Sequence, residues 1–265
     1  MRPGWCIMDG MDTDRRYDNN CEKIAAYLAA GACSPGDARL GFELEHFIVT
    51  RLPVTYRGHM RSDGSHVPGI IDVLTALSDD YDSTIMQSEP VGPDALIGLV
   101  RDKATITLEP GAQLEVSIGP AKDVAEIERV YTAFRTELDD VLAEAGYEVV
   151  LLGSHPSACA RDIPILPKER YHLMDALFAQ PGSHGICMMR GTASTQVSID
   201  YLDEADATRK FRIANLIGPL LAFLTDNAPV FEREPVGLVE DLVSAFENRA
   251  HGHDDTRDLV PDVLP

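Results

Sequence analysis

The stretch 105–118, TITLEPGAQLEVSI, carries the fold prediction. Polar and apolar residues alternate on each side of Pro110-Gly111, and a period of two is typical of half-buried strands. A Pro followed by a Gly suits a tight turn between two such strands. We therefore predict an antiparallel hairpin over these residues.

The two faces of this hairpin differ in chemistry. Leu114, Val116 and Ile118 would share an apolar face, while Gln113, Glu115 and Ser117 would share the other. Because Glu109 ends the preceding strand at the turn, the hairpin can present Glu109, Gln113 and Glu115 in one polar cleft. An ordinary amphipathic hairpin shows the same alternation, so the pattern by itself leaves both interpretations open.

A second acidic strand lies nearer the N-terminus, in GFELEHFIVTRLPV at 41–54. Glu43 and Glu45 leave the same face of this strand, opposite Phe42 and Leu44. Two carboxylates on one face repel unless a cation lies between them, although an isolated pair can simply be solvated. Two strands with such faces together favour a hard-metal site of oxygen ligands.

Outside these strands the chain mixes helices and strands without strict alternation. Helical spacing covers 21–30, 70–80, 123–146, 168–179 and 204–226, the last interrupted or kinked at Pro219, and strands are expected at 148–153 and 196–201. This order predicts an α+β fold with an antiparallel sheet flanked by helices. We expect three parts: a flexible segment at 1–18, a catalytic domain at 19–248 and an acidic tail at 249–265.

Composition narrows the class of protein. The 265 residues hold 23 Lys+Arg against 43 Asp+Glu, a net charge of −20, which argues against binding nucleic acid or an anionic membrane. The longest apolar run, Ile213 to Thr225, is too short to span a bilayer. Five cysteines without a CxxC pair favour a reduced, cytoplasmic protein.

Common nucleotide and hydrolase motifs are missing from the sequence. It contains no GxGxxG loop, no phosphate loop with a Gly-Lys pair, no GxSxG and no HExxH. A nucleotide would then be held by metal ions that carboxylates bind and that in turn bind phosphates.

Four segments resemble, in order, the motifs of the glutamate–cysteine ligase family of plants and many bacteria. They are GFELEHF (41–47), ITLEPGAQLEVS (106–117), DIPILPKERYHLM (162–174) and MMRGTASTQVSIDYLDEADATRKFR (188–212). The resemblance implies a glutamine-synthetase-like core with a funnel-shaped antiparallel sheet, truncated here at its C-terminus. It also implies ATP-dependent joining of the L-glutamate side-chain carboxyl to the amine of L-cysteine.

The same resemblance implies roles for individual residues. Glu43, Glu45, Glu109 and Glu115 would bind metal; Lys168 and Arg170 would be catalytic; Gln113, Tyr171, Thr192, Gln196 and Arg212 would bind substrate. Two alternatives stay open: the charges of KERY can face water at a helix start, and Arg209 and Arg212 can pair with Asp203 or Asp206.

The expected cofactor is Mg²⁺ or Mn²⁺, with ATP as co-substrate and L-glutamate and L-cysteine as small-molecule substrates. No nucleic-acid or membrane partner is expected, and a homo-oligomer or a second, completing chain stays open. Two alternatives keep the acidic face: a carboxylate–amine ligase with another amine, and a truncated homologue that binds metal or amino acid without turnover. A metal-dependent hydrolase is less favoured because no base and nucleophile pair is evident.

Overall fold

The structure, a computed structural model, describes residues 10–49, 54–87, 95–166, 168–179 and 184–235. Among the described residues, 10–39 and 199–221 form one compact unit, and 40–198 and 222–235 form a second. The predicted acidic strands both lie in the second unit, whereas the N-terminal helix and most of the last helix lie in the first.

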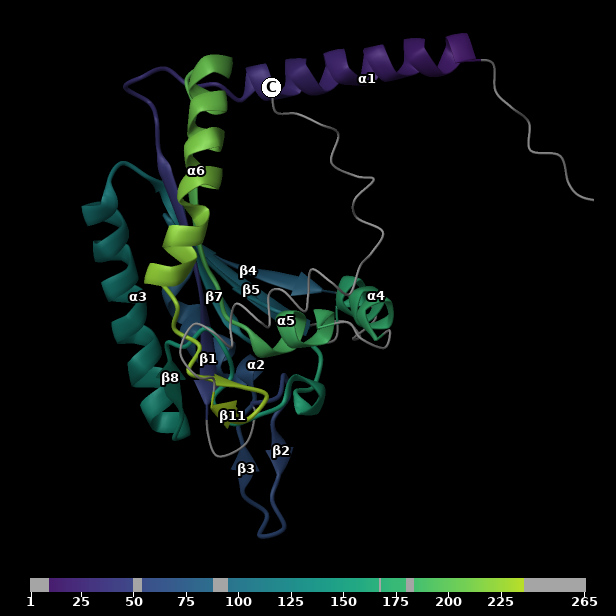
Figure 1. Cartoon of the computed structure of the whole chain (residues 1–265). Coiled ribbons are helices and arrows are strands. Elements are labelled where there is room, and N and C mark those ends of the chain that lie inside the picture. The colour runs from purple at the N-terminus through teal and green to yellow at the C-terminus, as the bar shows by residue number, and fades with distance from the viewer. Residues whose placement is uncertain (1–9, 50–53, 88–94, 167, 180–183, 236–265) are drawn as a thin grey trace, which may run out of the picture. The chain divides into compact units, whose positions relative to one another are not determined.

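The elements have the following bounds (Figure 1). The strands are β1 (Leu40–Val49), β2 (His59–Met60), β3 (His66–Val67), β4 (Ser83–Gln87), β5 (Ala95–Arg101), β6 (Ala104–Leu108), β7 (Leu114–Ala121), β8 (Glu148–Val150), β9 (Thr195–Ile199), β10 (Val230–Phe231) and β11 (Glu234–Pro235). The helices are α1 (Gly10–Ala30), α2 (Ile70–Leu77), α3 (Val124–Ala145), α4 (Glu169–Phe178), α5 (Gly185–Gly191) and α6 (Glu204–Leu224), with short 3₁₀ turns η1 (Ser78–Asp80) and η2 (Ala160–Asp162).

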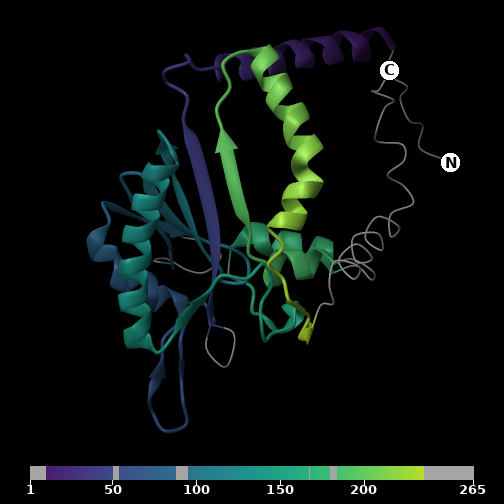
Figure 2. The same cartoon turned by 60° about the vertical axis from the view of Figure 1, so that its left-hand side comes forward.

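The second unit is built around one seven-stranded sheet, in which neighbouring strands are not always consecutive in sequence. Its strands run β4-β5-β6-β7-β1-β8, and β9 also pairs with β1. Figure 2 shows β9, in green, beside β1, in purple. The five neighbouring pairs along the β4-to-β8 path are antiparallel. The α+β prediction with an antiparallel sheet is therefore confirmed.

The predicted hairpin is the centre of this sheet. Over residues 114–118 of β7 every second residue is buried, so Leu114, Val116 and Ile118 face the core and Glu115 and Ser117 lie half-buried on the other side. On β6 the buried residues are Ala104, Ile106 and Leu108. The alternation of the sequence thus becomes one apolar and one polar face of the sheet.

Helix α3 covers the apolar face (Figures 1 and 2). Its N-cap Asp123 accepts a hydrogen bond from the Glu126 N–H at 2.8 Å, and it ends at Gly146, which is left-handed with φ 71°. Ile127, Phe134, Leu138 and Leu142 are buried along one side of the helix. They join the core that β6 and β7 form, while α4 and α5 lie on the other side of the sheet.

Several elements of the structure differ from the expected ones. Helix α1 begins at Gly10 rather than at residue 21, because the polar residues ahead of the apolar stripe continue the helix. Strands β4 and β5 were not expected, since the apolar run ALIGLVR of β5 lacks clear alternation. Of the expected interruption or kink at Pro219, the interruption is not found, because α6 continues through this residue.

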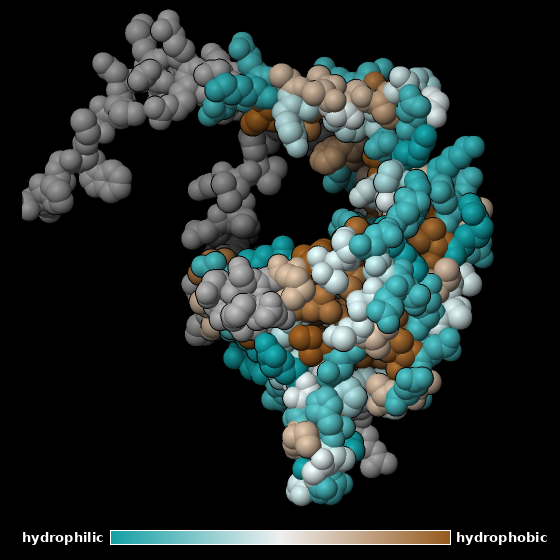
Figure 3. Space-filling view, turned by 180° about the vertical axis from the view of Figure 1, so that it is seen from behind, coloured by the Kyte–Doolittle hydropathy of each residue, from teal (hydrophilic) through white to brown (hydrophobic). Residues whose placement is uncertain are grey.

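Apolar side chains reach the surface along α6. Phe211 is 71% exposed and Leu216 is 81% exposed. Brown patches of hydrophobic residues are also visible among hydrophilic ones in Figure 3.

The expected division into parts at 1–18, 19–248 and 249–265 stays a prediction, and 249–265 lies outside the described residues.

Candidate functional site

The register between β1 and β7 brings the acidic residues of the two strands together. Glu45 lies directly opposite Glu115, and Glu43 lies opposite Ser117. The Cβ atoms of directly opposed residues in such a pair are about 4.5–5.5 Å apart, so these carboxylates are neighbours. All four residues are half-buried on the polar face of the sheet.

Glu109, at the end of β6, belongs to the same group electrostatically. Burial first, and then the charges of Glu115 and Glu45, raise its pKa above the ordinary value. Burial and the same two neighbours also raise the pKa of Glu43. The four carboxylates of Glu43, Glu45, Glu109 and Glu115 therefore influence one another electrostatically, and we call these four residues the acidic face.

The turn between β6 and β7 is tightly built. The Ala112 N–H donates to the Glu109 carbonyl at 2.9 Å, and Ala112 is left-handed with φ 64°. A side chain at Gly111 would meet the backbone carbonyl of Arg190 at 2.4 Å, so only glycine fits there. This packing fixes where Glu109 leaves the strand.

Gln113 ties this turn to the segment ahead of β9. Its side-chain oxygen accepts from the Gly111 N–H at 2.7 Å, and its side-chain nitrogen donates to the Thr192 carbonyl at 2.7 Å. The side chain is 2% exposed. Gln113 therefore links the β6–β7 turn to the segment of Thr192. Its contact with substrate stays a prediction.

Lys168, just before α4, reaches the end of β6. Its ammonium donates to the Leu108 carbonyl at 2.7 Å and is buried. Burial first, and then Arg170, lower its pKa to about 8, against the opposing effect of Glu109 and Glu115. The alternative that this charge faces water is wrong for Lys168.

Arg170 and Tyr171 lie beside Lys168, next to Glu109 of the acidic face. The Arg170 guanidinium donates to the Tyr171 hydroxyl at 2.7 Å, and that hydroxyl donates to the Leu108 carbonyl at 2.9 Å. Tyr171 Oη also lies 3.4 Å from Glu109 Oε1. Burial raises the pKa of Tyr171 to about 12, so it stays a neutral donor at ordinary pH.

Thr192, Ser194 and Gln196 lie where α5 passes into β9. The Thr192 hydroxyl donates to the Met188 carbonyl at 2.6 Å, and Gln196 is exposed on β9, the strand that pairs with β1. The intervening Ser194 donates to both oxygens of Glu45. The structure thus brings this segment to the acidic face. The contact with Glu45 is made by Ser194, which was not among the predicted site residues.

Two further hydroxyls hold Glu115. The Thr107 hydroxyl donates to Glu115 Oε1 at 2.8 Å, and the Ser117 hydroxyl donates to the same oxygen at 3.2 Å. Thr107 lies opposite Glu115 across β6 and β7. Sequence reasoning missed Thr107 and Ser194; the alternation of ITLEPG could have placed Thr107 on the polar face.

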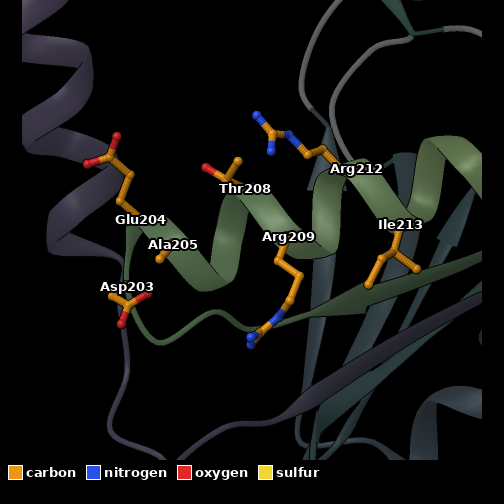
Figure 4. A pocket seen from close by; sticks show the side chains of 7 residues that line it. All are labelled: Asp203, Glu204, Ala205, Thr208, Arg209, Arg212 and Ile213. Carbon is orange, nitrogen blue, oxygen red and sulfur yellow. The ribbon is translucent and has the colours of Figure 1, made fainter.

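Arg212 belongs to the other compact unit, on α6. Together with Asp203, Glu204, Ala205, Thr208, Arg209 and Ile213 it lines a hollow on this helix, where the guanidinium groups of Arg209 and Arg212 point apart (Figure 4). Arg209 donates to Asp206 at 2.6 Å, so the structural alternative holds for Arg209. The predicted role of Arg212 in substrate binding stays a prediction.

The donor chemistry of the acidic face fits a hard divalent cation, because Mg²⁺ and Mn²⁺ prefer carboxylate oxygens. In the part of the chain that the structure describes, no group of three or more His, Cys, Asp or Glu side chains closes around a metal position.

Comparisons with known proteins agree with the motifs. A family model described as glutamate-cysteine ligase family 2 (GCS2) matches residues 39–257. The chain is 30% identical over 248 residues to the chloroplastic glutamate–cysteine ligase of Nicotiana tabacum, covering 92% of this chain and 43% of that protein. It is 30% identical over 222 residues to that of Arabidopsis thaliana, covering 82% and 40%.

The chain thus spans less than half the length of these curated relatives. Among the described residues, no helix has both the length and the apolar character that crossing a membrane requires. The family match nevertheless covers both acidic strands, the segment of Lys168 and the segment of Ser194. The chain belongs to glutamate-cysteine ligase family 2.

Proposed function

We propose that the protein joins the side-chain carboxyl of L-glutamate to the amine of L-cysteine at the expense of ATP, giving γ-glutamylcysteine. The observation that carries the proposal is the acidic face itself, with Glu45 opposite Glu115 and the buried cation Lys168 at its end. The family match and the names of the relatives support the same reaction.

The reaction needs a carboxylate oxygen to become a leaving group. A glutamate γ-carboxylate oxygen attacks the γ-phosphorus of ATP, the bond to ADP breaks, and an acyl phosphate forms. The cysteine amine then attacks the acyl carbon, inorganic phosphate leaves, and the amine loses a proton to form the amide. Both steps concentrate negative charge, which must be neutralised in a site that excludes water.

The chain's own cations suit this task. Arg170 presents a planar guanidinium, which fits a carboxylate or phosphate with two parallel hydrogen bonds. Lys168 brings a compact charge from the buried side and is held in place by the Leu108 carbonyl. Tyr171 connects the two, because its hydroxyl contacts Arg170, Leu108 and Glu109.

The acidic face would hold Mg²⁺ or Mn²⁺ through Glu43, Glu45, Glu109 and Glu115. Such an ion, when bound, would neutralise negative charge that develops on the phosphates. Because carboxylates already repel one another here, a cation between them would be favourable. The sheet would then correspond to the funnel of a glutamine-synthetase-like core.

Gln113, Thr192, Gln196 and Arg212 are proposed to line the amino-acid site. The relatives are chloroplastic proteins. The cytoplasmic location of this chain stays a prediction. A homo-oligomer or a completing chain likewise stays a prediction.

Phosphate release from ATP and Mg²⁺, with L-glutamate and each of several amines, tests the proposal. Release with L-cysteine, accompanied by γ-glutamylcysteine in the mass spectrum, is expected. Release only with another amine would mean a related ligase. Glutamate binding without release would mean a homologue that does not turn over.

A further inference from the structure

Ser194 and Glu45 are joined by three hydrogen bonds. The Ser194 N–H donates to Glu45 Oε2 at 3.0 Å and its hydroxyl donates to Glu45 Oε1 at 2.7 Å. The Glu45 N–H in turn donates to the Ser194 carbonyl at 3.0 Å. One residue therefore fixes the backbone of Glu45 and both of its carboxylate oxygens.

This hold distinguishes Glu45 within the acidic face. Glu43 lies two residues away on the same side of β1, and its carboxylate makes no hydrogen bond to any residue that the structure describes. A free glutamate side chain samples several rotamers, and ordering it costs free energy. Ser194 has already removed that freedom from Glu45.

Glu115, the cross-strand partner of Glu45, is held in the same manner by other hydroxyls. Thr107 and Ser117 both donate to its Oε1 atom. The two carboxylates at the centre of the acidic face are thus each oriented by neighbouring hydroxyl groups. Each oxygen of Glu45 accepts one of these hydrogen bonds and keeps a lone pair, and Glu115 Oε2 accepts neither of the two hydroxyl bonds, so both carboxylates keep acceptor capacity for a cation.

We propose that Ser194 is a positioning residue that aims the Glu45 carboxylate at the divalent cation of the acidic face. This inference rests on the proposed function, since it needs Glu45 to be a cation ligand. Groups that orient a metal ligand typically change metal affinity about 10- to 100-fold when they are removed. Because Ser194 is exposed, water replaces part of the lost hydrogen bonding, and we expect the lower end of this range.

The experiment measures binding of Mn²⁺ to the full chain by electron paramagnetic resonance, in the absence of ATP and amino acids. Four variants are compared with the wild type: Ser194→Ala, Ser194→Thr, Ser198→Ala and Glu45→Gln. Ser198 lies on β9, is also exposed, and its hydroxyl makes no hydrogen bond to a described residue, so it is the matched control. Thermal unfolding of each variant reports whether it folds.

The expected result is an affinity for Mn²⁺ about 10-fold lower in Ser194→Ala, restored to within about 3-fold by Ser194→Thr, which keeps the hydroxyl. Ser198→Ala should bind like the wild type. A purely structural role for Ser194 would lower unfolding temperature without this hydroxyl-dependent change in affinity.

Three results would overturn the inference. Wild-type affinity in Ser194→Ala, with loss of binding in Glu45→Gln, would mean that Glu45 needs no positioning. Tighter binding in Ser194→Ala would mean that the hydroxyl competes with the cation. Unchanged binding in Glu45→Gln would remove Glu45 from the metal site, and with it both this inference and the proposed metal site. Dependence on Ser194 and Glu45 without ligase turnover would support the inference while overturning the proposed function.

Discussion

Glu45 on β1 lies directly opposite Glu115 on β7, so two acids face each other across the centre of the sheet. Opposite charges stabilise such cross-strand pairs, and like charges destabilise them. The repulsion between the two carboxylates lowers folding stability, and a cation bound between them would relieve it. Each prediction below depends on a contact at or behind this acidic face.

Replacing Glu115 with glutamine removes one of the two facing charges. We expect Glu115→Gln to raise the free energy of unfolding by about 0.5 kcal/mol at pH 7 without added metal, because cross-strand repulsion is relieved. The glutamine carbonyl can still accept the Thr107 hydroxyl. Urea denaturation measures the change, and Glu148→Gln on β8 is the control for removing a strand carboxylate elsewhere. A less stable Glu115→Gln protein would contradict repulsion as the dominant effect.

Lys168 is expected to act as a cation. Its pKa is lowered to about 8 by burial, so the ammonium is mostly charged at pH 7 and loses its proton as the pH rises through 8. Turnover should therefore fall above about pH 8. Lys168→Met should lower turnover about 100-fold, the usual effect of deleting one charge-stabilising donor.

Lys122→Met, at an exposed lysine, serves as the control for the loss of a lysine. Phosphate release measured from pH 6.5 to 9.5 gives the profile. A flat profile across pH 8, or an active Lys168→Met enzyme, would exclude Lys168 from the charge-stabilising role.

His46 lies on the buried side of β1, behind the acidic face. Its Nδ1 lies 3.0 Å from the Leu114 carbonyl, which can only accept, so Nδ1 carries the proton and Nε2 accepts from the Tyr131 hydroxyl at 3.0 Å. Burial lowers its pKa from 6.5 to about 4. The unfolded chain therefore binds more protons between these values, and stability is lost as the pH falls from about 6.5 toward 4.

Between pH 7 and pH 5 the wild type should lose about 2 kcal/mol more stability than His46→Gln, which cannot titrate there. Urea unfolding gives the free energy of unfolding of each protein at pH 7 and at pH 5. Comparing the change between the two pH values in the two proteins removes any loss of stability that His46→Gln causes at every pH. Parallel pH dependence in the two proteins would show that His46 is not the titrating group.

Gly111 sets the turn that carries Glu109. Gly111→Ala places a Cβ atom 2.4 Å from the Arg190 carbonyl, and backbone cannot yield as a flexible side chain does. We expect a loss of about 2 kcal/mol in unfolding free energy from overpacking. Gly36→Ala, where a Cβ meets nothing within 4 Å, should change stability by less than about 0.5 kcal/mol. Equal effects of the two substitutions would contradict the tight turn.

The alternation of residues predicted much of the central sheet. Leu114, Val116 and Ile118 had to share a face with each other, and the face opposite had to be polar, because strand geometry allows nothing else. The pairing of Glu45 with Glu115 was different, since register depends on how two distant strands meet. The two acidic faces favoured a shared site of oxygen ligands, and the resemblance of the motifs to one family pointed the same way, but neither gave the register.

Tertiary contacts explain what the sequence did not indicate. The ammonium of Lys168 is buried because the start of α4 packs on the end of β6, a contact between residues 60 positions apart. Ser194 looked like an ordinary residue before a strand, and its role depends on β9 lying beside β1. Strand β5 lacked a period of two and could not be told from another apolar segment.

If the acidic face supports ATP-dependent ligation, loss of one of its carboxylates should abolish product formation. The most direct measurement is the amount of γ-glutamylcysteine and phosphate that the wild type, Glu45→Gln and Glu148→Gln form from ATP, Mg²⁺, L-glutamate and L-cysteine. The account predicts equal amounts of both products with the wild type and Glu148→Gln, and loss of both with Glu45→Gln that remains folded. Full product formation by Glu45→Gln, or none by the wild type, would contradict it.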